Sequence, residues 1–214
     1  CGHDSHTVWM LGLAKAMVAL KSDWKGTLIL VGQPAEEGVA GAKAMVQDRL
    51  YTRHGVPVPD YLLGMHSAPG PTGFVASAPG VQTAGSDVVE VVFKGIGGHV
   101  TEKSGTTPMV NDKAVIDAIN PPLANLLGPN KLIAAEFPGT TGSEDVHLLK
   151  GDNQTIKFGF AFVGIAEPSL VAKAQAEGKM VPFSNHNPNF QVDLNAIPLG
   201  AKVASVMTME LLNN

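Results

Sequence analysis

"TIKFGFAFVGI", residues 155–165, is the stretch of the chain that most constrains its fold. Aromatic, β-branched and glycine residues follow one another, and the only charge is Lys157 near the start. A strand that is apolar on both faces must be covered on both faces, which is typical of parallel sheets with helices on either side. The stretch therefore predicts a long buried strand in a sheet of this kind.

Helices and strands alternate along the rest of the chain. Met10, Leu13 and Met17 repeat at helical spacing, whereas residues 61–66 form a short apolar run. The expected helices cover 5–21, 39–49, 108–119, 144–150 (capped by Ser143), 168–178 and 195–212, and the other buried strands cover 26–32, 61–66 and 74–78. This order predicts an α/β fold with a mostly parallel sheet flanked by helices.

A different strand pattern begins after residue 82. In "SDVVEVVFK", residues 86–94, Val89, Val91 and Phe93 fall on one face and charged residues on the other. Such alternation indicates a strand that is exposed on one side, so we expect a change of domain near residue 82. The Pro- and Asn-rich "INPPLANLLGPN", residues 119–130, is expected to be a connection.

Composition excludes several functional classes. The 214 residues are 44% hydrophobic and carry a net charge of −4 without a Lys/Arg run, so no nucleic-acid or membrane-surface partner is expected. No apolar stretch approaches the roughly 20 residues of a membrane span. The single cysteine, Cys1, excludes a disulfide within the chain. Because natural chains rarely start with Cys-Gly-His-Asp, we expect upstream sequence to be missing, which leaves a cytoplasmic or periplasmic location open.

Residues that commonly bind metals stand at the ends of several predicted elements. Loops at the carboxyl ends of strands in an open α/β sheet meet in one crevice, so residues far apart in sequence can converge there. The candidates are Cys1, His3, Glu36, Glu37, His66 and His186.

The adjacent Glu36 and Glu37 are the most informative of these residues. They follow the apolar run of "LILVGQPAEEG", residues 28–38, without a nearby Lys or Arg in the sequence. A charge at the end of a buried strand is costly unless it is paired or bound to a metal. Thiolate, imidazole and carboxylate together suit zinc, or manganese, cobalt or nickel less selectively. One glutamate can then bind the metal while its neighbour takes a proton from a polarised water molecule.

Each of the other candidates also has a purely structural interpretation. Cys1 alone could be a small buried hydrophobe, and His3 and His6 could bond the nearby helix end. His66 could be a core histidine bonded to a backbone carbonyl, and His186 a solvated loop residue.

Seven short motifs nevertheless occur together and in order. They are "CGHDSHT", "GQPAEEG", "GAKAMVQD", "GMH", "GGH", "GSED" and "NHNP". As a set they resemble the aminoacylase, hippurate hydrolase and auxin-conjugate amidohydrolase family of dinuclear metallopeptidases. The resemblance covers nearly the whole chain. It implies a zinc-aminopeptidase-like catalytic domain with an inserted α+β lid, two divalent metal ions and a homodimer.

The resemblance also implies roles for single residues. The metal ligands of the family correspond to Cys1, His3, Glu37, His66 and His186. The first glutamate of the pair is the general base, which gives Glu36. The histidine of "GGH" belongs to the lid and reaches a substrate carbonyl, which gives His99.

The chain departs from the family pattern in two places. A segment that precedes "CGHD" in the family is absent, and the lid is much shorter. We therefore expect residues 1–82 and 121–214 to form the catalytic domain and residues 83–120 to be the remnant of a lid or dimerisation domain. With so short a lid, the homodimer of the family becomes doubtful for this chain.

Two functions remain open at this point. The first is metal-dependent hydrolysis of the amide bond of N-acyl amino acids or short peptides, as an amidohydrolase, aminoacylase or carboxypeptidase would catalyse. The alternative is a non-catalytic metal-binding fragment of such an enzyme. A serine hydrolase is disfavoured because no G-x-S-x-G motif occurs.

Overall fold

The computed structural model describes residues 2–94, 97–136 and 139–213, and for 87–94 and 97–104 it describes the backbone. The helices are α1 (His3–Ala19), α2 (Gly41–Gln47), α3 (Lys113–Leu127), α4 (Pro168–Ala176) and α5 (Ala196–Leu212), with short 3-10 turns η1 (Lys21–Asp23), η2 (Glu36–Gly38) and η3 (Val146–Lys150). The strands are β1 (Tyr61–Pro71), β2 (Val75–Ala76), β3 (Gly80–Thr83), β4 (Ser86–Lys94), β5 (Gly97–Thr106), β6 (Met109–Asn111), β7 (Leu132–Ile133) and β8 (Lys157–Ala166). None of the described helices is long and apolar enough to span a membrane.

The main sheet has the strand order β1-β8-β2-β7. β1 and β8 run parallel, with Gly64 opposite Phe160 and His66 opposite Phe162. β2 is antiparallel to β8 and parallel to β7, so the sheet is mostly parallel, as predicted. The predicted strand 155–165 corresponds to β8, which lies inside the sheet and is buried along nearly its whole length.

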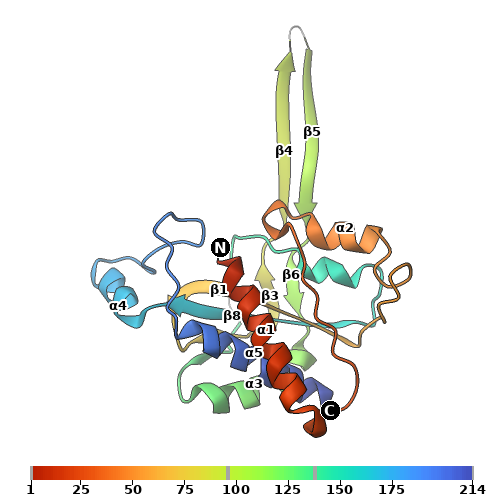
Figure 1. The fold of residues 1–214 in the computed structure, drawn as a ribbon. Coiled ribbons are helices and arrows are strands. Elements are labelled where there is room, and N and C mark those ends of the chain that lie inside the picture. Colours follow the sequence, from red (N-terminus) through yellow and green to blue (C-terminus); the bar gives the residue numbers. More distant parts are fainter. Residues whose placement is uncertain (1, 95–96, 137–138, 214) are drawn as a thin grey trace.

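Helices and loops lie on both faces of this sheet (Figure 1). The side chains of β8 alternate between the two faces. Ala161, Val163 and Ile165 face a core formed with α1, α3 and α5. Phe158 and Phe160 face the other side, where α2 and η3 contribute a second apolar cluster. The two-residue period of a strand explains why this stretch reads as continuously apolar.

Close packing of α1 on α5 depends on two small residues. A Cβ atom at Gly12 would lie 2.5 Å from the Cβ of Ala201. A Cβ atom at Gly200 would lie 2.2 Å from the Trp9 ring, whose Nε1 donates a hydrogen bond to the carbonyl of Ala196 at 3.1 Å. These contacts fix where α1 begins relative to the sheet.

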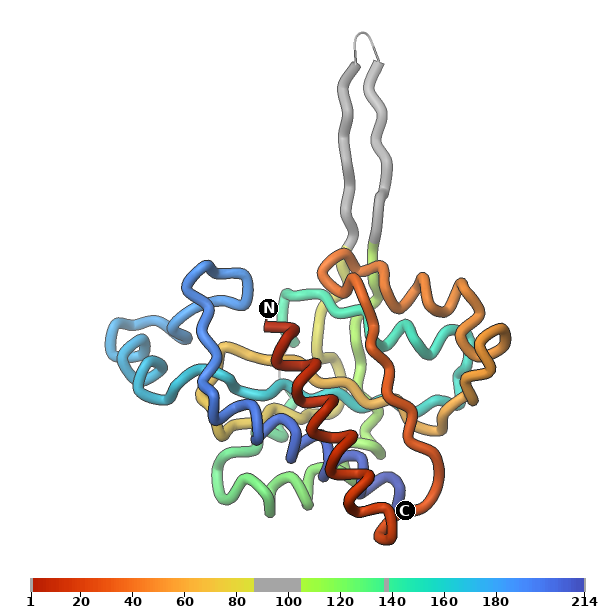
Figure 2. Tube along the Cα trace, viewed as in Figure 1, coloured from red at the N-terminus to blue at the C-terminus, as the bar shows by residue number. Residues whose placement is uncertain are grey.

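β4 and β5 form a two-stranded antiparallel ribbon that stands away from the rest of the chain (Figure 1). At its base β3 pairs with β6, with Gly80 opposite Asn111 and Thr83 opposite Met109. Figure 2 shows that the chain leaves and re-enters the main body at neighbouring points. The strand predicted over 86–94 is β4, while its predicted exposure on one side concerns side chains outside the described part.

The predicted buried strand over 26–32 is wrong. The segment has no regular secondary structure, no described strand pairs with it, and Leu30 is 41% exposed. Leu28 and Leu30 instead line a hollow on α1 together with Met17 and Trp24. An apolar run becomes a strand only when another strand lies beside it, and the sequence of the run does not contain that information.

Two expectations about helices are also corrected. The expected connection over 119–130 is largely helical, because α3 continues through Pro121 and Pro122 to Leu127. Leu123 and Leu127 extend the buried stripe of this helix into the main core, together with α5, and this burial outweighs the two missing backbone donors. The expected cap at Ser143 is not found, since η3 begins at Val146 without a side-chain cap.

Candidate metal centre

The start of α1 and the end of the apolar part of β1 meet at the candidate site. Gly2 has φ of 74°, and a Cβ there would lie 2.8 Å from the Phe190 ring, so glycine suits the turn from which α1 starts. His3 is therefore the first residue of the helix, and His6 follows one turn later on the same face. The ring centroids of His3 and His66 are 5.5 Å apart, and those of His6 and His66 are 4.5 Å apart.

The loop that carries the two adjacent glutamates is fixed at both ends by Asp145. This carboxylate is fully buried and accepts hydrogen bonds from Gln33 Nε2 at 2.5 Å and from the backbone N–H of Ala42 at 3.1 Å. Gln33 precedes the loop, and Ala42 lies in the first turn of α2. Between them Ala35 adopts φ of 54°, an uncommon conformation for a residue with a side chain. The loop therefore has a defined path, and it brings Glu36 to the histidines.

Glu36 is the carboxylate nearest to the imidazoles. Its Oε2 lies 3.3 Å from His3 Nε2, and both atoms are buried without a hydrogen-bond partner. Glu144 contributes a second carboxylate. One ligand atom each from Glu36, His66 and Glu144 lie within 4.8 Å of one another, and the same holds for His3, His6 and His66. These five side chains form what we call the His–Glu cluster.

Backbone hydrogen bonds hold Glu144 in this cluster. Its Oε1 accepts from the N–H groups of Asp145 at 2.8 Å and Val146 at 3.0 Å, while its residue is only 6% exposed. The two bonds occupy one carboxylate oxygen. The other oxygen remains available to the cluster.

The His–Glu cluster perturbs the pKa values of its members strongly. Burial raises the pKa of Glu36 to about 7, and the charges of Glu144 and Asp145 add to the effect. Burial lowers the pKa of His6 to about 3 and that of His66 to about 4. The imidazoles are therefore neutral near pH 7, which is the form that binds metals.

This donor set fits a divalent metal ion. Neutral imidazole nitrogens and carboxylate oxygens converge here. Two of these atoms, His3 Nε2 and Glu36 Oε2, are buried without a hydrogen-bond partner. Among the described residues, no Lys or Arg lies at ion-pair distance from the carboxylates of the cluster. Mixed nitrogen and oxygen donors suit zinc and other first-row transition metals. A bound cation would satisfy the orphaned atoms and favour the ionised carboxylates.

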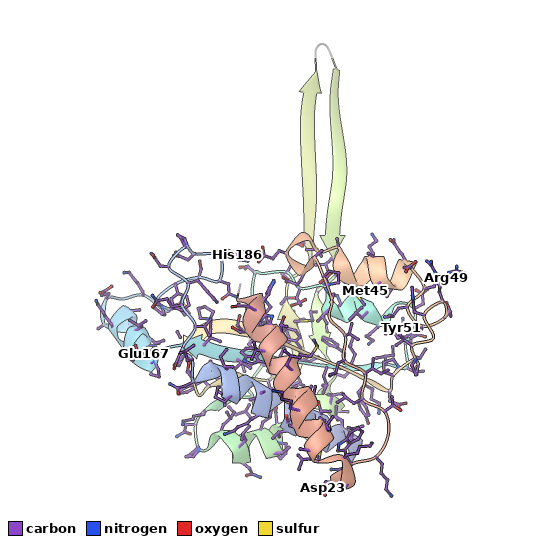
Figure 3. The ribbon with its side chains drawn as sticks, in the orientation of Figure 1. Asp23, Met45, Arg49, Tyr51, Glu167 and His186 are labelled. Carbon is purple, nitrogen blue, oxygen red and sulfur yellow. The ribbon has the colours of Figure 1, made fainter. Side chains whose placement is uncertain are left out.

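The six candidate residues of the metal site and His99 lie in different places in the structure. His3, Glu36 and His66 lie together in the cluster. Glu37 is exposed in η2, although its charge acts on His3. His186 is exposed on a loop near the start of α1 (Figure 3), and its charge lowers the pKa of both His3 and His66. Cys1 lies outside the described residues. The backbone of His99 is in β5 opposite Val92, and its side chain is outside the described part.

Sequence reasoning missed two members of the cluster. His6 was given only a structural interpretation, although its spacing of three residues from His3 on a helix places both on one face. Glu144 was assigned to a helix start, although it belongs to the "GSED" motif, in which a carboxylate follows two small residues. Neither signal identifies a member of the cluster without the fold.

Comparison with known proteins identifies the chain's relationships. The sequence profile of peptidase family M20/M25/M40 matches residues 1–209. An IAA-amino acid hydrolase ILR1-like 2 of Arabidopsis thaliana is 36% identical over 118 residues, which are 54% of this chain and 26% of that protein. A hippurate hydrolase of Campylobacter jejuni is 39% identical over 100 residues, 46% of this chain and 25% of that protein. The aligned part thus spans about a quarter of each of these relatives.

A solved structure shows the same fold. The dinuclear metal-binding peptidase YXEP of Bacillus subtilis, of the M20 family, superimposes with a TM-score of 0.71 at 19% identity. The superposition covers all of this chain and 73% of that protein. The chain therefore has the same overall fold as that solved structure.

Proposed function

This chain belongs to peptidase family M20/M25/M40, and from this premise we propose that it carries the catalytic centre of a metal-dependent amidohydrolase. Its substrates are N-acyl amino acids or short peptides, and the bond cleaved is the amide. The names of its relatives support this class, since they include an IAA-amino acid hydrolase, a hippurate hydrolase and an N-acetylcysteine deacetylase.

Two divalent ions, zinc or else manganese, cobalt or nickel, complete the proposed site. The residues that would hold them are the five ligands implied by the family motifs: Cys1, His3, Glu37, His66 and His186. Bound there, such ions polarise the substrate carbonyl and lower the pKa of water. The neutral imidazoles of His3 and His66 and the dinuclear character of the related solved structure support this assignment.

Glu36 acts as the proton carrier in this proposal. Its side chain is 19% exposed, so it is reachable from solvent yet poorly solvated. A carboxylate with a pKa of about 7 can take a proton from water and return it to the leaving amine near neutral pH. Burial keeps the pKa of Glu36 high, and the negative charges of Glu144 and Asp145 raise it further.

One observation carries the proposal most directly. His3 Nε2 and Glu36 Oε2 lie 3.3 Å apart, buried and without a hydrogen-bond partner, at the point where α1, the glutamate loop and β1 meet. Orphaned polar atoms are rare in protein interiors and ask for an explanation. A metal ion bound by these two atoms is such an explanation, and the family's motifs in this chain favour it.

The ribbon β4–β5 occupies the place of the lid in the proposed architecture. His99 lies in its second strand, and we assign it the role of reaching the substrate carbonyl. In the family the lid of one chain serves the partner's site in a homodimer, whereas the shortened lid of this chain argues against that assembly. Sedimentation of the purified chain tests that part separately.

The proposed function is tested by comparing Glu36→Gln with Glu37→Gln. With zinc or manganese supplied, the unaltered chain is expected to release the amino acid from N-acetyl and N-benzoyl amino acids. Glu36→Gln should abolish release and retain most of the metal, whereas Glu37→Gln should lose metal as well. Bound metal without hydrolysis in the unaltered chain would favour the non-catalytic fragment, and equal metal loss in both variants would overturn the division of roles.

A further inference from the structure

The peptide groups on either side of Ser67 join three segments of the candidate metal centre. The N–H of Ser67 donates a hydrogen bond to His6 Nε2 at 2.9 Å. The carbonyl of Ser67 accepts from His66 Nδ1 at 2.7 Å and from Asn185 Nδ2 at 3.3 Å. Ser67 is completely buried. One backbone position therefore connects α1, β1 and the loop that carries His186.

The bond from Ser67 decides what His6 can do. A ring nitrogen that accepts a hydrogen bond uses its lone pair for that bond, so His6 Nε2 is not available to a metal ion. The proton of the neutral ring must then be on Nδ1. His6 lies within the His–Glu cluster, and by spacing alone it would count as a ligand. The hydrogen bond instead makes it a support for the residue that follows His66.

The same position fixes the tautomer of His66. A carbonyl oxygen only accepts, so the 2.7 Å contact requires the proton on His66 Nδ1. The lone pair is then on Nε2, the nitrogen that remains for a metal ion. A histidine ligand whose other nitrogen donates to a carbonyl is held in orientation and becomes a stronger donor.

Asn185 extends the arrangement to the last proposed ligand. It immediately precedes His186, and its side-chain amide is tied to the same carbonyl that orients His66. Movement of the loop would therefore be restrained at the residue next to His186. The loop itself has few regular elements, so this bond is one of the contacts that fix its position.

We propose that His6 and Asn185 are positioning residues that act through the Ser67 backbone to set the geometry of His66 and His186, and that His6 is not a metal ligand. The inference rests on the proposed function, because it assumes that His66 and His186 bind metal. It adds two residues that the family motifs do not single out as ligands, and it assigns them a physical role.

Metal affinity tests the proposal without relying on catalysis. Zn²⁺ alone is titrated into the unaltered chain, His6→Ala, His6→Gln and Asn185→Ala against a competing chelator, with His54→Ala as the control at an exposed histidine. We expect His6→Ala and Asn185→Ala to bind the same number of ions about 10- to 100-fold more weakly. His6→Gln should recover most of the affinity, because its side-chain oxygen can accept the Ser67 N–H. Loss of one ion per chain in both His6 variants would identify His6 as a ligand, and unchanged affinity in both alanine variants would refute positioning.

A spectroscopic measurement keeps the proposal testable even if the metal-free chain binds Zn²⁺ poorly. Nitrogen-15 correlation spectra of the metal-free chain at pH 7 should show His6 and His66 with the proton on Nδ1, whereas free histidine prefers Nε2. The Ser67 amide should exchange slowly in the unaltered chain and in His6→Gln, and quickly in His6→Ala. An Nε2 proton on His6 would overturn the inference. Failure of hydrolysis with these signatures intact would count against the proposed function alone.

Discussion

Replacing Glu36 by Gln should stabilise the metal-free protein, although the same change should abolish the hydrolysis proposed above. The reason is the raised pKa of Glu36, which lies at about 7 in the folded chain against 4.5 as the ordinary value. Burial and the neighbouring carboxylates make its ionised form unfavourable only when the chain is folded. The glutamine has nearly the same shape and carries no charge, so it escapes that penalty.

The size and the pH range of this effect follow from linkage. Below pH 4.5 Glu36 is protonated in both the folded and the unfolded chain, and the substitution gains nothing. Between pH 4.5 and 7 the unfolded chain loses the proton while the folded chain keeps it, so the stability of the unaltered protein falls as pH rises. Above pH 7 the penalty is complete. At about 1.4 kcal/mol for each pKa unit, the rise corresponds to about 3 kcal/mol at most, since Glu36 is partly exposed.

Urea unfolding of chelator-treated protein at pH 5 and pH 8 measures the difference. We expect Glu36→Gln to raise the free energy of unfolding by about 2–3 kcal/mol at pH 8 and by less than about 1 kcal/mol at pH 5. Glu37→Gln, at an exposed neighbour, is the matched control and should show little change at either pH. Equal stabilisation of Glu36→Gln at both pH values would show that the gain does not come from ionisation and would refute the reasoning.

Three other outcomes are expected. Because burial holds the pKa of His6 near 3 and that of His66 near 4, the metal-free Glu36→Gln protein, which lacks the opposing titration of Glu36, should lose at least about 3 kcal/mol as pH falls from 6.5 to 4, measured by urea unfolding across that range; a flat profile would contradict it. Asp145→Ala should lower the free energy of unfolding by about 3–5 kcal/mol, since two hydrogen bonds to a buried carboxylate are lost. Amide hydrogen exchange should become faster in the loop that carries Glu36 and Glu37. Unchanged exchange there would show that Asp145 does not hold this loop in place. Gly200→Ala should lower stability by at least about 2 kcal/mol by overpacking the indole ring, while Gly32→Ala, with open space around its Cβ, serves as the control in thermal unfolding.

Much of the fold could be predicted because its signals are local. The strand at β8, the first helix and the last helix are encoded by runs and periodicities that lie within each element. The residues 26–32 were misassigned because a strand needs a partner, and pairing is a long-range property. The sequence predicts that the helix ends at residue 119, because Pro121 and Pro122 are local signals that end helices. α3 continues to Leu127 because Leu123 is buried in the core, and this tertiary contact is not visible in the local sequence.

The site was predictable to a smaller extent. Motif residues such as His3, Glu36 and His66 can be chosen as candidates because their chemistry is visible in the sequence, and the fold brings these side chains close together. The role of His6 depends on the direction of one hydrogen bond from the backbone of Ser67. No property of the letters around residue 6 encodes that bond, since it joins positions 61 residues apart.

The β4–β5 ribbon has a consequence for how this chain can change in length. Its two strands begin and end beside each other, because Thr83 pairs with Met109 directly below them. Thr106 and Thr107, at the foot of the second strand, bond to Glu144 and His147 and must be kept. An insertion within the ribbon above them lengthens only a closed excursion of the chain, and the entropic cost of such lengthening grows slowly. The ribbon can therefore be replaced by a short turn or by a whole folded module, and the strands of the main sheet keep their positions. The ribbon is therefore a suitable site for domain insertion, and a fluorescent or affinity module placed there should leave the candidate metal centre intact.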